Sequence, residues 1–237
     1  MKIKTNFTLF FLLFFSLVYS QEFKFGIKGG VNYNLIGTLF HNGEQNGGGA
    51  NLTPPDDTNY AANKDMGYQA GFFINAKFDS FFLKSEINYT KLKNNYALAK
   101  ETSYWESTRF DIPVLFGLNL SEPFSIYAGP VLNSISDTKL DGVETPFQFK
   151  KTATSISAGV LIDFRRFGID IRYQYNISKT EEQRIDIVRA KYGTNIAHML
   201  EYNQSQILIS AHINLITINA NEKGHRIKSN WRGKPCF

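Results

Sequence analysis

The sequence predicts an all-β fold, an eight-stranded antiparallel up-and-down transmembrane β-barrel. Between residues 22 and 216, apolar and polar side chains alternate with a period of two, as in strands that have one apolar and one polar face. The connections between these segments are alternately short and long. After residue 20, no apolar run is long enough to cross a bilayer as a helix, so an inserted chain must cross as strands.

The two ends of the 237-residue chain carry most of its positive charge. Lys2 and Lys4 precede an apolar run over residues 7–18, which predicts a signal peptide at 1–20, cleaved before Gln21. Residues 217–237 are rich in Lys and Arg and are predicted to form a disordered basic tail in the periplasm. The segment 21–216 is nearly neutral although the chain has a formal net charge of +5, which excludes a globally basic nucleic-acid binder.

The eight strands are defined by the limits of the alternation. They are predicted at residues 23–35, 68–78, 81–90, 109–119, 124–137, 155–165, 167–178 and 206–215. Their apolar faces begin, in order, with Phe23, Tyr68, Phe81, Phe110, Phe124, Ile156, Phe167 and Ile207. The fifth strand alternates least well and the seventh most clearly, because apolar residues at 167–177 regularly face Gly, Asp, Arg, Gln and Asn.

Short turns are predicted near residues 79–80, 121–123 and 165–166, and longer loops at 37–66, 91–106, 138–151 and 179–205. In outer-membrane barrels the short turns lie in the periplasm and the long loops outside the cell, and eight strands return the chain to the periplasm. Residues 46–57 lack apolar periodicity and are predicted to be flexible. Residues 181–200 are predicted to form a short amphipathic helix or strand extensions.

The alternation alone also fits a soluble lipocalin-type barrel, which is apolar inside and polar outside. The positions of the glycines favour the opposite orientation. Most strand glycines share the polar face, and Gly29 is the clear exception. Glycine has no side chain, so it makes room on the crowded concave side of a narrow barrel. With the apolar face toward lipid, two girdles of aromatic residues are predicted at the membrane boundaries: Tyr33, Tyr89, Tyr173 and Tyr175 near the loops, and Phe78, Phe81, Phe124 and Phe167 near the turns.

The polar face then carries ionisable groups into the lumen. Each residue is assigned to a face by its parity, that is, by its odd or even place in the alternation of its strand. Parity assigns to the polar face Lys24, Lys28, Lys77, Lys84, Arg109, Arg165 and Arg172 together with Glu86, Asp111, Asp163, Asp170 and His212. The interior of an eight-stranded barrel is only wide enough to be filled by side chains, so these charges are predicted to pair and plug it. The excess of positive groups leaves open a narrow anion-biased pore.

Two further sets of residues carry predictions. Pro113 and Pro130 fall inside strands of a barrel without free edges, which predicts local bulges. Asp186, His198 and Ser205 lie near the outer rim and allow a lipid-modifying enzyme, although no motif connects them and a non-enzymatic barrel is favoured. The other histidines are scattered, and Cys236 is the single cysteine, so neither a metal nor a cofactor is expected.

Four segments resemble one family, the PorT-type outer-membrane β-barrel domain of porin-family proteins, which are small barrels like OmpA and OmpX. They are residues 24–32 (KFGIKGGVN), 109–115 (RFDIPVL), 126–130 (IYAGP) and 168–175 (GIDIRYQY). The resemblance covers residues 22–216. It implies the outer membrane of a Gram-negative bacterium, contact with outer-membrane lipid and lipopolysaccharide, and a surface or cell-envelope protein as partner. Members of this family have no common biochemical activity, so the resemblance implies a location more than a reaction.

Overall fold

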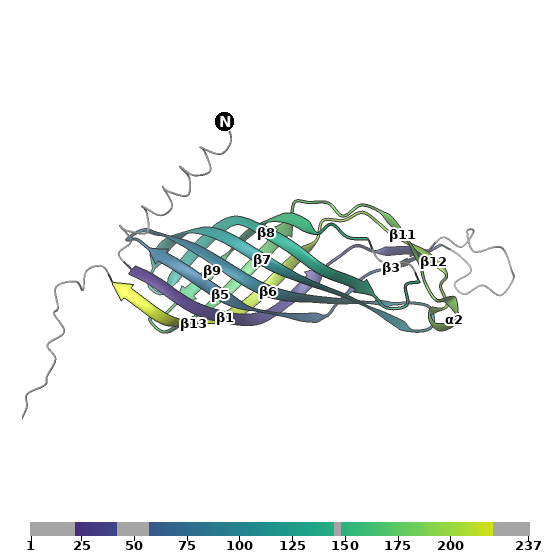
Figure 1. Cartoon of the computed structure of the whole chain (residues 1–237), viewed down its shortest axis with the longest axis horizontal. Coiled ribbons are helices and arrows are strands. Elements are labelled where there is room, and N and C mark those ends of the chain that lie inside the picture. The colour runs from purple at the N-terminus through teal and green to yellow at the C-terminus, as the bar shows by residue number, and fades with distance from the viewer. Residues whose placement is uncertain (1–21, 42–56, 145–147, 220–237) are drawn as a thin grey trace, which may run out of the picture.

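The computed structural model describes residues 22–41, 57–144 and 148–219 and shows an all-β barrel. Its wall consists of eight antiparallel strands, namely β1 (Glu22–Leu35), β5 (Met66–Lys77), β6 (Phe81–Ala97), β7 (Thr102–Ser121), β8 (Phe124–Leu140), β9 (Thr152–Asp163), β10 (Phe167–Asn176) and β13 (Ser205–Asn219). The ring is closed because β1 pairs with both β5 and β13, and β6 pairs with both β5 and β7 (Figure 1). The predicted fold class is confirmed. No helix in the described ranges is both long and apolar enough to cross a bilayer.

The three predicted short turns join β5 to β6, β7 to β8 and β9 to β10 at one end of the barrel. The start of β1 and the end of β13 lie at this same end (Figure 1). β13 continues to Asn219, where it pairs with Glu22, so the last strand is longer than the sequence predicted. Arg165 was predicted to point into the lumen, but it lies in the β9–β10 turn and is exposed, because β9 ends at Asp163.

The wall is taller on one side than on the other. β7 has 20 residues and β6 and β8 have 17 each, whereas about 9–11 residues cross a bilayer. β10 has 10 residues and β9 has 12. The predicted loops at 91–106 and 138–151 are therefore wrong in part, since most of the first and the start of the second are extensions of membrane strands.

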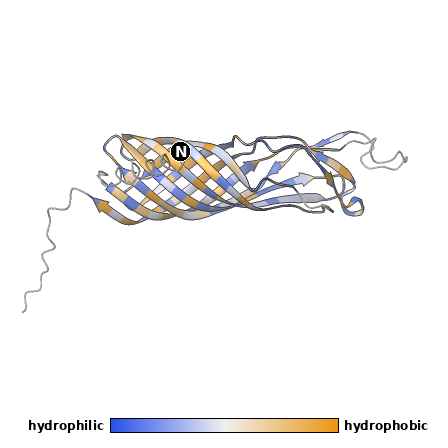
Figure 2. Ribbon diagram, turned by 45° about the horizontal axis from the view of Figure 1, so that its top comes forward, coloured by the Kyte–Doolittle hydropathy of each residue, from blue (hydrophilic) through white to orange (hydrophobic). Residues whose placement is uncertain are grey.

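The polarity of the two faces reverses along these extensions. In the lower part of β6, Ile87 and Tyr89 face outward while Glu86 is buried inside. Higher up, Lys91 and Lys93 lie outside and pair with Glu106 of β7, while apolar side chains turn inward. The reversal follows the solvent, because lipid surrounds the lower part of the wall and water surrounds the upper part. Figure 2 shows the alternation of hydrophobic and hydrophilic residues along the barrel strands.

A small domain, called the head below, covers the tall end of the barrel. It contains a four-stranded sheet in the order β11 (Gln183–Asp186), β12 (Ile196–Met199), β2 (Leu39–His41) and β3 (Thr58–Tyr60), and the four-residue helix α2 (Arg189–Tyr192). A short strand, β4 (Asn63–Lys64), extends the barrel sheet beside β6. Of the two alternatives predicted for 181–200, the short helix is present, whereas β11 and β12 belong to the sheet of the head and do not extend the barrel strands. Residues 42–56, which include most of the segment predicted to be flexible, lie outside the described residues.

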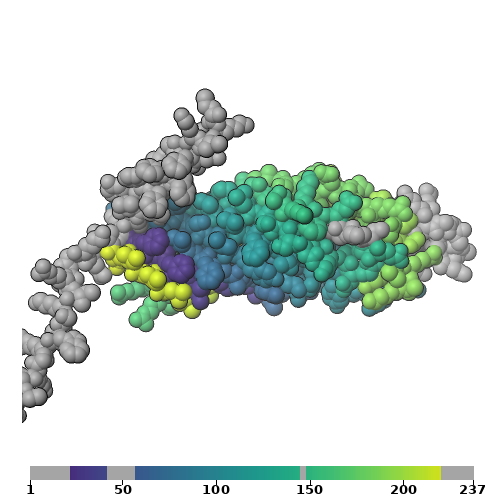
Figure 3. Space-filling model, viewed as in Figure 1, coloured from purple at the N-terminus to yellow at the C-terminus, as the bar shows by residue number. Residues whose placement is uncertain are grey.

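The head has a hydrophobic core of its own. Its buried members are Leu39, Tyr60, Leu92, Tyr96, Leu98, Trp105, Leu140, Ile185, Ile187, Tyr192, Ala197 and Met199. They come from the loops between β1 and β5 and between β10 and β13, and from the upper parts of β6, β7 and β8. Leu98 comes from the connection between β6 and β7. Figure 3 shows the head, coloured green at its far end, as a direct continuation of the barrel.

Pro113 and Pro130 do not produce the predicted bulges. Pro113 pairs with Val131 and Pro130 with Ile156, and the register is the same on both sides of each pair. Opposite Pro113, the β6–β7 ladder skips two residue pairs without changing register. Proline removes a backbone donor but inserts no residue, so the ladder loses bonds and the strand does not bulge. The irregularities of the wall lie elsewhere, for example between Phe25 and Gly26.

The outer surface of the barrel matches the predicted girdles. The tyrosines predicted near the loops and the phenylalanines predicted near the turns are exposed, except that Phe78 is half-buried and stacks on Phe81 with 4.4 Å between the ring centroids. Between the girdles the exposed residues are mostly Ile, Val, Leu and Phe. This surface is the one that a barrel in lipid requires.

Candidate functional site

The polar lumen is the first candidate site, and the inward-facing residues of the strands form it. Of the residues assigned to it by parity, the buried ones are Lys24, Lys28, Lys84, Glu86, Arg109, Asp111, Asp170, Arg172 and His212. Lys77 and Asp163 are half-buried at the rim on the side of the short turns, and Arg165 lies outside as described. The alternation of the strands thus brings this set together from seven different strands.

The centre of the lumen is a network of ion pairs around Glu86. Its carboxylate accepts hydrogen bonds from Lys28 Nζ at 3.0 and 3.1 Å and from the Arg172 guanidinium at 2.9 and 3.1 Å. Lys84 Nζ lies 3.1 Å from Glu86 Oε1 and 4.7 Å from the ring centroid of Phe73. Asp170 Oδ2 accepts hydrogen bonds from both Lys28 Nζ and Arg172 Nη2 at 2.8 Å. These three cations and two carboxylates have a formal sum of +1 and connect strands β1, β6 and β10.

Tyr127 closes this network on one side. Its hydroxyl donates a hydrogen bond to Asp170 Oδ1 and accepts one from Arg172 Nε at 3.0 Å. The ring of Tyr127 belongs to an apolar layer next to the network, which consists of Phe82, Leu115, Tyr127 and Leu161, all buried. Sequence reasoning missed this layer because it treated the inward face as polar throughout, although Phe82, Leu115 and Leu161 have the inward parity.

Two smaller clusters lie above and below the centre. Toward the head, Asp111 accepts hydrogen bonds from Arg109 Nε and from Thr90 Oγ1 at 2.8 Å, and Asn133 also donates to it. Toward the periplasm, Asp163 accepts a hydrogen bond from Lys24 Nζ at 2.8 Å and lies 3.0 Å from His212 Nε2. At the rim, Lys77 Nζ lies 3.6 Å from Glu122 Oε1.

These clusters place paired side chains along the inner face of the barrel. Each predicted lysine or arginine that lies in the lumen or at its rim has a carboxylate within 4.0 Å. Glycines on the inner face make this filling possible, since a Cβ on Gly117 would lie 2.2 Å from the Phe82 ring and one on Gly159 would lie 2.5 Å from the Tyr127 hydroxyl. Gly29 faces outward as predicted, and the nearest atom to its Cβ would be 3.7 Å away.

The head is the second candidate site. Tyr96 donates a hydrogen bond from its hydroxyl to the carbonyl of Gly37 at 2.7 Å, which ties the top of β6 to the start of the first loop. Burial raises the pKa of Tyr96 above its ordinary range and raises the pKa of Tyr202 to about 12. Gly193 ends α2 in the left-handed conformation, with φ of 76°, and its N–H bonds to the carbonyl of Arg189.

The three residues considered for catalysis are divided between the two parts of the molecule. Asp186 and His198 lie in strands β11 and β12 of the head, whereas Ser205 begins barrel strand β13 and pairs with Leu35. His198 Nδ1 lies 3.3 Å from Glu182, and Asp186 accepts a hydrogen bond from Arg184. In the residues that the structure describes, no group of three or more His, Cys, Asp or Glu could hold a metal ion.

The sequence matches the family described as outer membrane protein beta-barrel domain over residues 19–182. Among solved structures, Neisserial surface protein A is similar at 11% identity with a TM-score of 0.42, and the match covers 80% of this chain and 96% of that one. A Pseudomonas aeruginosa homologue of FadL is similar at 11% identity with a TM-score of 0.28, covering 81% of this chain and 50% of that one. No curated protein sequence matches the chain.

Proposed function

Because the chain belongs to the family of outer membrane protein beta-barrel domains, we propose that it is a non-conducting outer-membrane protein that acts at the cell surface through its head. The observation that carries this proposal is the hydrophobic core of the head. Loops that only connect membrane strands have no need for a shared buried core. A folded head holds its exposed residues in fixed positions, as recognition of a partner requires.

The ion pairs of the lumen support a plug rather than an anion-biased pore. A selective anion pore needs cations that are free to meet the permeating ion. Here the central cations Lys28, Lys84 and Arg172 are held by Glu86 and Asp170. Moving any of them into a conducting arrangement would leave a buried charge without its partner.

The remaining parts of the proposal follow from the sequence. Residues 24–32 and 168–175 support assignment to the PorT-type group within the family. The run of apolar residues after Lys4 supports export by a cleaved signal peptide. The proposed role is structural or one of surface interaction and involves no catalysis. The proposed partners are outer-membrane lipid, lipopolysaccharide and a surface or envelope protein.

Two measurements test the proposal. In planar bilayers, folded protein is expected to produce no discrete conductance steps, and regular steps from a sample that migrates as folded protein would refute the plug.

In a strain that lacks the protein, the envelope defect is expected to be restored by wild type and by the surface variant Arg189→Asp, but not by Ile187→Asp. The Ile187→Asp variant places a charge in the core of the head, where Ile187 is 1% exposed. Full restoration by Ile187→Asp, with its barrel inserted, would refute a role for the head.

A further inference from the structure

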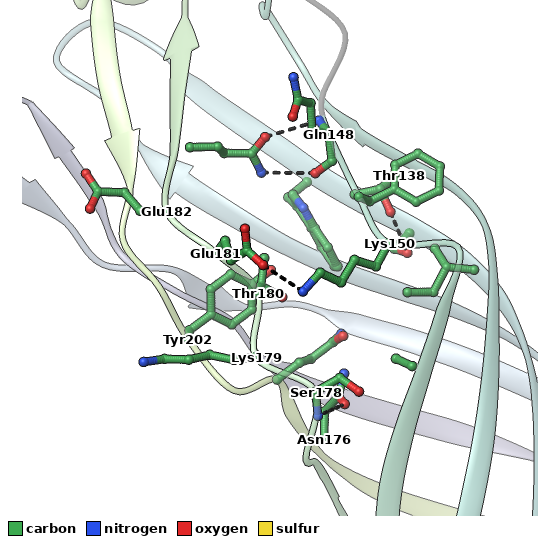
Figure 4. A pocket seen from close by; sticks show the side chains of 17 residues that line it. Thr138, Gln148, Lys150, Asn176, Ser178, Lys179, Thr180, Glu181, Glu182 and Tyr202 are labelled. Carbon is green, nitrogen blue, oxygen red and sulfur yellow. Dashed lines mark hydrogen bonds and ion pairs between the residues drawn. The ribbon is translucent and has the colours of Figure 1, made fainter.

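A cavity of about 240 Å³ lies where the barrel wall meets the head. β8 pairs with β9 only as far as Ser134 and Thr152, and the upper part of β8 continues to Leu140 without this neighbour. Residues 148–150 and 178–183 pass beside the gap and complete the walls of the cavity (Figure 4). The cavity is therefore a consequence of the unequal strand lengths on the two sides of the barrel.

The lining combines apolar and uncharged polar groups. Trp105, Ile135, Phe149, Ala153 and Tyr202 supply the apolar part. Hydroxyl and amide groups of serine, threonine, asparagine and glutamine residues from the barrel and the loops supply the polar part. A mixed lining of this kind suits a ligand with an apolar body and a few hydrogen-bonding groups.

Both lysines of the lining are paired with carboxylates, and Glu182 lies beside a histidine. Lys150 Nζ donates to Glu181 at 2.8 Å, as Figure 4 shows. Lys179 Nζ lies 2.6 Å from Glu201, and Glu182 lies 3.3 Å from His198. A charged ligand would have to compete with these existing pairs, so the cavity favours an uncharged one.

Trp105 supplies a hydrogen-bond donor that the protein does not use. Its side chain lines the cavity and is 3% exposed, and its Nε1 has no hydrogen-bond partner within the described part of the chain. Indole N–H groups usually have a partner when they are buried. An oxygen atom of a bound molecule would provide the missing acceptor.

We propose that this cavity binds a small uncharged molecule that has an aromatic or aliphatic body and an oxygen that accepts a hydrogen bond from Trp105. The site is separate from the plugged lumen, and its occupancy does not depend on the role proposed for the head. Gln204 marks the boundary between the two sites, because it lines the cavity while its amide donates to Asn34 and its oxygen accepts from Arg109.

The first test uses fluorine NMR with 4-(trifluoromethyl)benzyl alcohol as the probe, and the full chain in lipid nanodiscs with empty nanodiscs as background. Wild type is expected to shift or broaden the fluorine signal in a saturable way. Ala153→Phe should weaken binding at least tenfold, because Ala153 is 9% exposed and lines the cavity. The matched control Ala158→Phe makes the same change on the lipid side of the same strand and should bind as wild type does. Equal binding by wild type and a folded Ala153→Phe variant would overturn the proposal.

The second test remains informative even if Ala153→Phe does not fold. Trp105→Phe retains an aromatic ring but removes the donor, and is expected to weaken binding about threefold to tenfold. Two probes of the same shape, 4-(trifluoromethyl)benzoate and 4-(trifluoromethyl)benzylammonium, should bind wild type at least tenfold more weakly than the alcohol. Unchanged affinity in Trp105→Phe would overturn the role of its N–H, and stronger binding of either ion would overturn an uncharged ligand.

Discussion

Replacing a single charged residue in the lumen lowers stability mainly because its charged partners remain buried without a counter-charge. Glu86 is 1% exposed and contacts Lys28, Lys84 and Arg172. Within the described part of the chain, removing the Glu86 carboxylate leaves Lys28 and Arg172 with only Asp170 as a counter-charge. Lys84, which pairs with Glu86, would lose its carboxylate partner. The cost of removing Glu86 is therefore expected to exceed the value of any one ion pair.

Glu86→Gln is expected to destabilise the barrel by about 3–5 kcal/mol, because buried cations lose their counter-charge. The control Glu106→Gln removes a half-exposed partner of Lys91 and should cost less than about 1 kcal/mol. Urea unfolding in lipid vesicles, followed by the gel shift between folded and unfolded protein, measures both. Similar midpoints for the two variants would show that the central network is not important for stability.

Gly117→Ala should destabilise the barrel by about 1–3 kcal/mol, because its Cβ would lie 2.2 Å from the buried ring of Phe82. The same change at outward-facing Gly29 has its nearest neighbour at 3.7 Å and should alter stability by less than about 0.5 kcal/mol. The same unfolding assay compares them. A larger effect at Gly29 would contradict the assignment of the faces.

Tyr202 provides a pH-dependent prediction. Desolvation raises its pKa to about 12, from an ordinary value near 10. The folded state thus holds the phenol proton more tightly than the unfolded state does. This contribution to stability is complete below pH about 10 and is lost as the pH rises toward about 12.

The measurement is an absorbance titration at 295 nm of wild type and Tyr202→Phe. The difference between the two curves isolates one tyrosine and is expected to have its midpoint near pH 12. A midpoint near pH 10 would contradict the desolvation of the Tyr202 hydroxyl group.

The predictions made from the sequence were most accurate for residues of the membrane strands. Parity placed Lys28, Glu86 and Arg172 inside because the period of a strand leaves only two choices and the glycines decided between them. Which of these charges meet was not predictable, since strands far apart in the chain supply Glu86 and Arg172. Arg165 was misplaced because parity has no meaning once a strand has ended.

At the scale of elements, the head is what the sequence analysis missed. The signal was present: alternation continues through residues 91–96, but with lysines outside and Leu92 and Tyr96 inside. A search of the sequence for strands with an apolar outer face ends at the position where the surroundings of the strand change from lipid to water. A search that allows the apolar side chains to change from the outer to the inner face would have extended the predicted strand to Ala97, where β6 ends.

Ile187→Asp is expected to unfold the head and leave the barrel folded, because Ile187 belongs to the core of the head and makes no part of the lumen. Limited proteolysis of protein in vesicles should cut the head of this variant rapidly, while the folded form remains visible by its gel migration. The surface variant Arg189→Asp is the control and should resist cleavage as wild type does. If Ile187→Asp also lost the folded barrel, the two parts would form one cooperative unit.

At the scale of the whole molecule, the barrel has a defined direction in the membrane. The tall side and the head are at one end, and the short turns and the ends of β1 and β13 are at the other (Figure 1). In a Cys236→Ser background, Lys139→Cys lies on the outside of the tall wall, where the lysine side chain is 73% exposed. Arg166→Cys lies in a short turn and is also exposed.

A membrane-impermeant maleimide is expected to label intact cells through Lys139→Cys and not through Arg166→Cys. Both should react after the outer membrane is opened, which shows that each thiol is accessible. Labelling of Arg166→Cys alone on intact cells would show that the barrel has the opposite orientation in the membrane.

The sequence by itself determined the fold class, the number of membrane strands and the face that each strand presents to lipid. These properties depend on local periodicity and turn chemistry, which a single chain displays directly. Only the tertiary structure decided that the lumen charges form one network around Glu86, that the loops share a hydrophobic core, and that a cavity remains above β9. Each of these depends on contacts between residues far apart in the chain, which the local pattern does not encode.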